Sequence, residues 1–115
     1  MSIQPYATAA PSRAEVDAFA GATLIQFGTD WCGFCKAVEP LVNKVLADYP
    51  DVRHLKIEDG SGRPLGRSFR VKLWPTLIFM RDGVELSRLV RPGNVSDIEE
   101  AFEGGGARAD RTCRL

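Results

Sequence analysis

The sequence predicts an α/β domain in which a central mixed β-sheet carries helices on both faces. Three patterns in the 115 residues support this fold class. Residues 24–27 form a short apolar run that is typical of a buried strand, and apolar residues at helical spacing follow from residue 34. Residues 76–80 and 85–90 flank a turn signal and predict a β-hairpin. Strands joined by helices favour parallel pairing, and the hairpin adds antiparallel strands.

The first half of the chain is expected to hold two helices around the central strand. Residues 3–6 are expected to form a short strand at the sheet edge. A capping box at Ser12 predicts a helix that ends at Gly21. The helix over residues 34–49 contains Pro40, which is expected to bend it without dividing it in two.

The second half continues the alternation. Residues 52–57 alternate between apolar and polar and predict a strand, and residues 64–69 predict a short helix or turn. A capping box at Ser96 is expected to open the last helix. The chain is therefore expected to divide into an N-terminal segment (1–11), one domain (12–103) and a flexible glycine-rich tail (104–115).

Composition argues against several classes of function. The 15 basic and 15 acidic side chains cancel, and a pI of 6.6 gives no electrostatic reason to expect nucleic acid or an anionic membrane as partner. No apolar run approaches the ~18 residues of a membrane-spanning helix. The first residues lack the basic start and apolar stretch of a secretory signal. Three cysteines do not make a disulfide framework, and we expect a cytoplasmic protein.

Cys32 and Cys35 lie where the central strand gives way to the long helix. Unpaired N–H groups and the positive end of the helix dipole favour a thiolate at this position. The spacing allows a disulfide, and so small a loop constrains the unfolded chain very little. We therefore interpret the pair as a disulfide that opens and closes. The alternative is half of a zinc site, for which His54 and Cys113 are the remaining candidate ligands, and we expect no metal.

The segment Trp31-Cys32-Gly33-Phe34-Cys35, with Trp74-Pro75-Thr76 about forty residues later, resembles the thioredoxin family. The resemblance implies a thioredoxin fold and a protein-disulfide reductase. Cys32, at the start of the helix, is expected to be the exposed nucleophile, and the more buried Cys35 to resolve the mixed disulfide. We also expect a monomer with no cofactor besides this disulfide, acting on disulfide-containing proteins and recharged by an electron donor of the thioredoxin-reductase type.

Three residues beside the cysteines are candidates for substrate contact. Trp31 is either a lid over the disulfide, as the resemblance favours, or a core aromatic. Gly33 lets a partner backbone approach closely. Phe34 replaces the proline of the typical Cys-Gly-Pro-Cys motif, and its ring is either an exposed contact surface or folded onto the domain.

The resemblance adds a second group of candidates for substrate contact. It implies that Pro75 is cis and faces the disulfide, and that the backbone of Trp74 hydrogen-bonds an extended substrate segment. A Trp74 buried in the core is the alternative. Arg91 lies where thioredoxins often carry a small Gly-Ala pair, so it either alters partner docking or is a solvated side chain.

Gln26 departs from the family in a way that bears on proton transfer. Typical thioredoxins carry a buried aspartate six residues before the first cysteine, and this aspartate is thought to relay the proton of the resolving thiol. Gln26 cannot ionise, although its amide forms hydrogen bonds. His54 aligns with a lysine near that acid and is the candidate to take the proton. The alternatives are a surface histidine and transfer to water alone.

Two other kinds of function remain open. An adaptor or chaperone would bind partners through the aromatic-rimmed face of Trp31, Phe34 and Trp74, but it would need neither thiol. A disulfide isomerase or oxidase would keep both thiols, but the absence of an export signal from the sequence argues against it.

Overall fold

The structure, a computed structural model, describes residues 4–104. Four strands form one sheet in the order β2-β1-β3-β4, with bounds β1 Ala22–Gly28, β2 Arg53–Glu58, β3 Thr76–Arg81 and β4 Val84–Val90. Strand β1 pairs in parallel with β2 and antiparallel with β3, and β4 pairs antiparallel with β3. The predicted mixed sheet is therefore confirmed.

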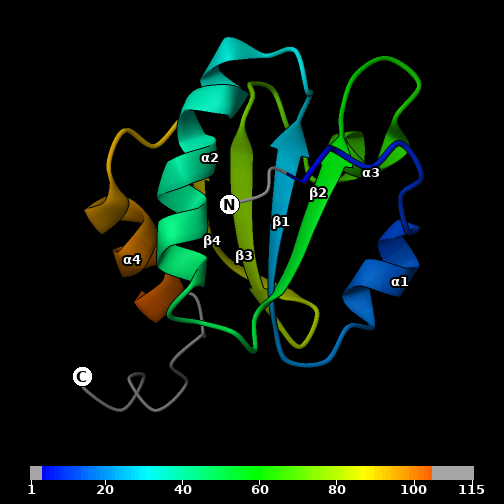
Figure 1. Cartoon of the computed structure of the whole chain (residues 1–115). Helices are drawn as coiled ribbons and strands as arrows, with labels where there is room; N and C mark the ends of the chain where they lie inside the picture. Colours follow the sequence, from blue (N-terminus) through cyan, green and yellow to red (C-terminus); the bar gives the residue numbers. More distant parts are fainter. Residues whose placement is uncertain (1–3, 105–115) are drawn as a thin grey trace.

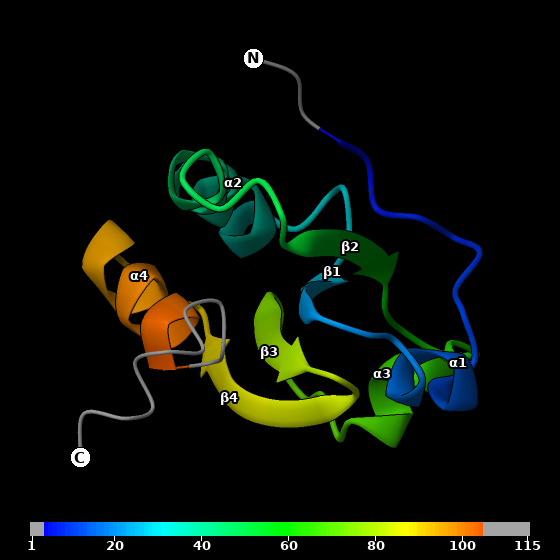
Figure 2. The ribbon, with the colours of Figure 1, turned by 90° about the horizontal axis from the view of Figure 1, so that it is seen from below.

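Helices cover both faces of this sheet (Figures 1 and 2). Helices α2 (Gly33–Leu46) and α4 (Val95–Gly104) lie on one face, and the short helices α1 (Arg13–Asp17) and α3 (Pro64–Ser68) lie on the other. None of the helices in this described part of the chain is long and apolar enough to cross a bilayer.

Alternation along β1 distributes its side chains between two hydrophobic clusters. Leu24 packs with Val42, Leu77 and Phe102 on the face of α2 and α4. The next residues along the strand, Ile25 and Phe27, pack on the opposite face, in the cluster that contains Val16, Leu65 and Phe69. Because side chains alternate along a strand, Gln26 shares the face of Leu24 and lies under α2. The alternation of side chains along β1 therefore places the buried amide of Gln26 beside α2, the helix that begins with the two cysteines.

The structure corrects four details of the predicted elements. Residues 4–6 form no strand. Among the described residues, this N-terminal segment pairs with the sheet only through an isolated parallel β-bridge between Ala7 and Ile57 of β2. Helix α1 ends at Asp17 rather than at Gly21, and α2 ends at Leu46 rather than at residue 49. Helix α4 begins one residue before Ser96, and it is capped by Asn94, whose Oδ1 accepts from the N–H of Asp97 (2.9 Å).

The turn between β3 and β4 is fixed by backbone conformation. Asp82 and Gly83 have φ values of 51° and 81°, the left-handed geometry of a type I′ hairpin. A Cβ at Gly83 would lie 1.9 Å from the carbonyl oxygen of Asp17, so the turn packs directly against α1. Only glycine fits at this contact.

Candidate active site

The two cysteines occupy the first turn of α2. Cys32 is the N-cap residue, and its Sγ accepts a hydrogen bond from the N–H of Cys35 (3.2 Å). Both are free thiols and both are buried, with 8% of Cys32 exposed and 1% of Cys35. The structure thus corrects the expectation of an exposed Cys32, which is only the less buried of the two because it caps the helix. Among residues 4–104, no group of three or more side chains that could hold a metal ion lies together.

Cys35 lies in an environment that keeps its thiol protonated. Burial and a hydrogen bond with Cys32 raise the pKa of Cys35 to about 11, against the opposing effects of hydrogen bonds with the backbone of Thr29 and with the side chain of Tyr6. A Cβ at Gly28, the last residue of β1, would lie 2.5 Å from Cys35 Sγ and 2.9 Å from the Tyr6 hydroxyl. The absence of a side chain at position 28 therefore makes room for this contact.

A hydrogen-bond network surrounds the fully buried amide of Gln26. Its Nε2 donates to the hydroxyl of Tyr6 (2.9 Å) and to Oε2 of Glu39 (3.2 Å). Its Oε1 lies 2.9 Å from Nε2 of His54, and since an amide oxygen only accepts, this nitrogen carries the proton of the imidazole. Through Tyr6, which also hydrogen-bonds Cys35, the network reaches the buried thiol.

His54 is neutral near pH 7. Burial, and secondarily the charge of Lys56, lower the pKa of His54 from 6.5 to about 4. The imidazole binds the amide oxygen of Gln26, whereas Tyr6 binds the amide nitrogen, so His54 has no hydrogen bond with Tyr6 in this network.

Glu39 and Lys56 form an ion pair in the core behind Cys35. Their side chains are 9% and 1% exposed, and Lys56 Nζ also donates to the carbonyl of Gln4. Burying two charges is costly unless they are paired and hydrogen-bonded, and this pair meets both conditions. The carboxylate of Glu39 stands one helical turn after Cys35, on the inner face of α2.

A small cavity connects Glu39 to Cys35. It has a volume of about 30 Å³ and is lined by both residues, together with Tyr6, Thr29, Asp30, Lys36 and Lys56. Thr29 is 2% exposed, and its Oγ1 is buried without a hydrogen-bond partner among the residues described. A cavity of this size with several polar groups in its wall suits a water molecule.

Sequence reasoning missed Tyr6, Glu39 and Lys56 in this arrangement. Glu39 falls between the apolar positions Val38 and Val42 of α2, and an acid inside an apolar helical stripe is the signal that marks it. Tyr6 belongs to a segment with little pattern of its own.

Two exposed aromatic side chains flank Cys32. Trp31 is 72% exposed and Phe34 is 56% exposed, so neither belongs to the core. The ring of Trp31 meets that of Trp74 edge to face, with the centroids 5.7 Å apart. A Cβ at Gly33 would meet nothing within 4 Å, so the backbone between the cysteines is open to a partner.

Trp74 is partly buried and joins the surface to the cysteines. It packs against the cluster that contains Cys32 and Cys35, and its Nε1 donates to Oδ2 of Asp59 (2.8 Å). The peptide bond from Trp74 to Pro75 is cis, as expected.

Arg91 follows β4 and reaches across to this face. Its Nε donates to the carbonyl oxygen of Trp74 (2.8 Å), and its guanidinium carbon lies 4.0 Å from the centroid of the Phe34 ring. The backbone of Arg91 has a φ of 52°, and its N–H donates to the carbonyl of Pro75. The exposed arginine is thus held in place by two neighbours. Cys113 lies outside the described residues.

Comparisons with known proteins agree with this geometry. The family model described as Thioredoxin matches residues 6–103. The chain is 41% identical over 71 residues to a thioredoxin of Chlamydia trachomatis, covering 61% of this chain and 69% of that protein. It is 31% identical to Thioredoxin Asp f 28 of Aspergillus fumigatus over 83 residues, which are 72% of this chain and 77% of the relative.

A solved structure, thioredoxin 2 from Pseudomonas aeruginosa PAO1 in its reduced form, is similar with a TM-score of 0.81 and 60% identity. The match covers 89% of this chain and 94% of that one. With the dithiol at the start of α2 and Trp74, which precedes the cis proline, packed against it, these findings show the fold and the chemistry together. The chain belongs to the thioredoxin family and is a thiol–disulfide oxidoreductase that reduces protein disulfides.

Proposed function

We propose that Cys32 and Cys35 reduce disulfides of cytoplasmic proteins and that a reductase of the thioredoxin-reductase type recharges them. The observation that carries this proposal is the unequal burial of two thiols in one helical turn. Cys32 is the N-cap of α2 and the less buried thiol, so we expect a substrate sulfur to meet it first, and Cys35 lies in the first turn behind it.

The reaction takes two exchanges. The thiolate of Cys32 attacks one sulfur of the substrate disulfide, a new S–S bond forms, and the other substrate sulfur leaves as a thiolate. The thiolate of Cys35 then attacks Sγ of Cys32, which releases the second substrate sulfur and leaves a Cys32–Cys35 disulfide. Two electrons and two protons pass from the protein to the substrate, and the donor returns them.

The second exchange requires a proton to leave Cys35, whose pKa is raised to about 11. Glu39 is the buried carboxylate that shares a cavity with this thiol, and we assign it the role of proton acceptor. Tyr6 accepts from Gln26, which leaves its own proton free to hydrogen-bond the developing thiolate. In this scheme Gln26 and His54 orient Tyr6 and Glu39.

Trp31, Gly33, Phe34, Trp74 and Pro75 form the substrate-docking face in this proposal. An extended substrate segment would hydrogen-bond the backbone of Trp74. The Trp74 carbonyl already accepts from Arg91, so a substrate that uses this carbonyl must displace the guanidinium. Arg91 thereby controls access to the docking face.

The test is to trap the mixed disulfide. Cys35→Ser removes the second exchange, so the variant, itself reduced beforehand, is expected to hold a protein substrate covalently on Cys32 after exposure to a cell lysate that is kept free of added reductant and still contains protein disulfides. Cys32→Ser serves as the matched control and is expected to hold none. If Cys35→Ser captures nothing while its Cys32 reacts with an alkylating reagent, the proposed role of Cys32 is wrong.

A further inference from the structure

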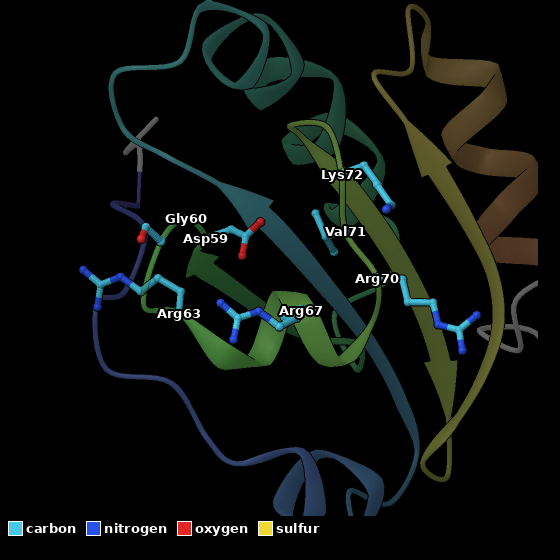
Figure 3. A pocket seen from close by; sticks show the side chains of 8 residues that line it. Asp59, Gly60, Arg63, Arg67, Arg70, Val71 and Lys72 are labelled. Carbon is cyan, nitrogen blue, oxygen red and sulfur yellow. The ribbon is translucent and has the colours of Figure 1, made fainter.

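A larger pocket lies beside the docking face, on the side of α3. It has a volume of about 440 Å³ and is formed by the loop after β2, by α3 and by the segment that leads to β3 (Figure 3). Four cationic residues line it: Arg63, Arg67, Arg70 and Lys72.

Three of these cations have no side-chain partner among the residues that the structure describes. Arg63 pairs with Glu58 (2.9 Å) and also donates to the carbonyl of Thr8. The side chains of Arg67, Arg70 and Lys72 are exposed and make no ion pair or hydrogen bond with any residue in the range 4–104. An excess of positive charge therefore faces solvent here.

The excess is a local property, because the whole chain has 15 basic and 15 acidic residues. Part of the compensating negative charge lies on α4, which carries Asp97, Glu99, Glu100 and Glu103 and covers the opposite face of the sheet (Figure 2). This separation of positive from negative charge favours the binding of an acidic partner, and disfavours that of a basic partner, on the side of α3.

The pocket is joined to the docking face through Asp59. One carboxylate oxygen of Asp59 accepts from the indole N–H of Trp74, and Asp59 also lines the pocket. The chain from Arg70 to Trp74 spans at most about 14 Å when extended, so a substrate segment of similar length bridges the two sites.

We propose that this pocket binds acidic side chains of disulfide-bonded protein substrates, within about four residues of the cysteine that Cys32 attacks. The occupant is a polypeptide because the exchange at Cys32 already places one next to Trp74. Carboxylates are the complement of three unpaired cations, and guanidinium groups bind them in a bidentate manner. This inference rests on the proposed docking face and adds a preference among its substrates.

Disulfide-linked peptide dimers test the pocket. Two peptides differ only at the positions two and four residues from the cysteine, which carry Glu in one and Gln in the other. The second-order rate constant for reduction by the full chain is measured at 20 mM and 500 mM NaCl. We expect the Glu peptide to react roughly five times faster than the Gln peptide at low salt, and the ratio to fall toward one at high salt.

The variant Arg67→Gln/Arg70→Gln/Lys72→Gln is expected to bring the Glu-to-Gln ratio to about one at low salt. Lys44→Gln, which removes an exposed cation from the last turn of α2, is expected to keep the wild-type ratio. The double variant Arg67→Gln/Lys72→Gln leaves the left-handed Arg70 in place, and it is expected to lower the ratio if the triple variant fails to fold.

A wild-type ratio of one at low salt, with both peptides reduced, contradicts the pocket assignment and leaves the reductase function intact. Failure to reduce either peptide contradicts the proposed function instead. A 20-nucleotide single-stranded DNA that abolishes the ratio, where an equally charged poly-Glu peptide does not, shows that the pocket prefers nucleic acid and overturns the proposal.

Discussion

Nε2 of Gln26 lies 3.2 Å from Oε2 of Glu39, a contact that joins the central strand to the redox helix behind Cys35. The amide of Gln26 has no titratable proton, whereas Glu39 is a carboxylate with a charged partner in Lys56. In this protein the buried acid near the resolving thiol therefore stands on α2 and not on β1.

Replacement of Glu39 by Gln should slow the second exchange. The isosteric Glu39→Gln removes the proton acceptor but keeps the shape of the side chain, so release of the substrate thiol is expected to slow at least about tenfold at pH 7. The deficit should shrink as the pH approaches the pKa of Cys35, about 11, because hydroxide then removes the proton. Stopped-flow tryptophan fluorescence follows this step.

Two further variants separate proton transfer from structural damage. Glu100→Gln, on the exposed face of α4, should leave the rate unchanged. Gln26→Asp in the Glu39→Gln background should restore part of the lost rate, because it returns a carboxylate to the same network. A Glu39→Gln protein with the wild-type pH–rate profile would show that water alone accepts the proton.

His54 should make the protein less stable in acid. Its pKa is about 4 in the folded state and 6.5 when unperturbed, so between these values the unfolded chain binds one proton more. This contribution to stability is complete above pH 6.5 and is lost as the pH falls toward 4. From pH 7 to pH 5, we expect a loss of about 2 kcal/mol in the free energy of unfolding.

Urea denaturation at both pH values measures this effect. His54→Gln supplies the comparison, because its amide can still donate to Gln26, and His54 is the only histidine in the sequence. The variant should lose about 2 kcal/mol less than the wild type over the same pH interval. Equal losses in the two proteins would mean that His54 titrates normally.

Cys32 should react with iodoacetamide well before Cys35 at pH 7. Cys35 is 1% exposed and has a pKa near 11, so its thiolate is scarce and hard to reach. Mass spectrometry of the reduced protein after brief alkylation locates the label. Preferential labelling of Cys35 would reverse the assigned roles.

Removal of the Arg91 side chain should open the docking face. Arg91→Ala frees the carbonyl of Trp74 and uncovers the ring of Phe34. We expect formation of the mixed disulfide with an uncharged peptide to speed up roughly two- to fivefold, the value of one hydrogen bond that no longer has to be broken. Arg88→Ala, which removes an arginine of β4 paired with Glu85, is the matched control and should leave this rate unchanged. A slower reaction of Arg91→Ala would show instead that the guanidinium contacts the substrate.

Local patterns predicted the parts of the fold that local chemistry determines. The apolar run that ends at Phe27 is a strand, and the helical spacing of the apolar residues after it placed the cysteine pair at the start of a helix, where Cys32 is the N-cap. Asp82 and Gly83 predicted the hairpin because both tolerate the left-handed conformation. The capping box predicted at Ser96 is wrong because Asn94, two residues earlier, already binds the N–H of Asp97.

The part of the site formed by adjacent residues, the cysteine motif, was predicted from the sequence. The part formed by residues from distant segments was not. Tyr6 is held near Cys35 by residues far away in the sequence, since its N–H donates to Asp30, 24 residues away, and its hydroxyl accepts from Gln26. Glu39 falls inside the apolar stripe of its helix, but its partner Lys56 comes from a separate strand, so the buried ion pair follows only from the fold. The bond from Arg91 to the carbonyl of Trp74 depends on a left-handed backbone that no sequence pattern specifies.

The reduction of insulin disulfides with dithiothreitol as electron donor tests the central claim most directly. The wild-type chain is expected to accelerate precipitation of the insulin B chain, Cys32→Ser to give the uncatalysed rate, and Cys35→Ser to stall after forming a mixed disulfide. These results would establish catalysis by Cys32 with resolution by Cys35. Equal rates for the wild type and Cys32→Ser would contradict it, and they would leave a protein that uses its aromatic face only to bind partners.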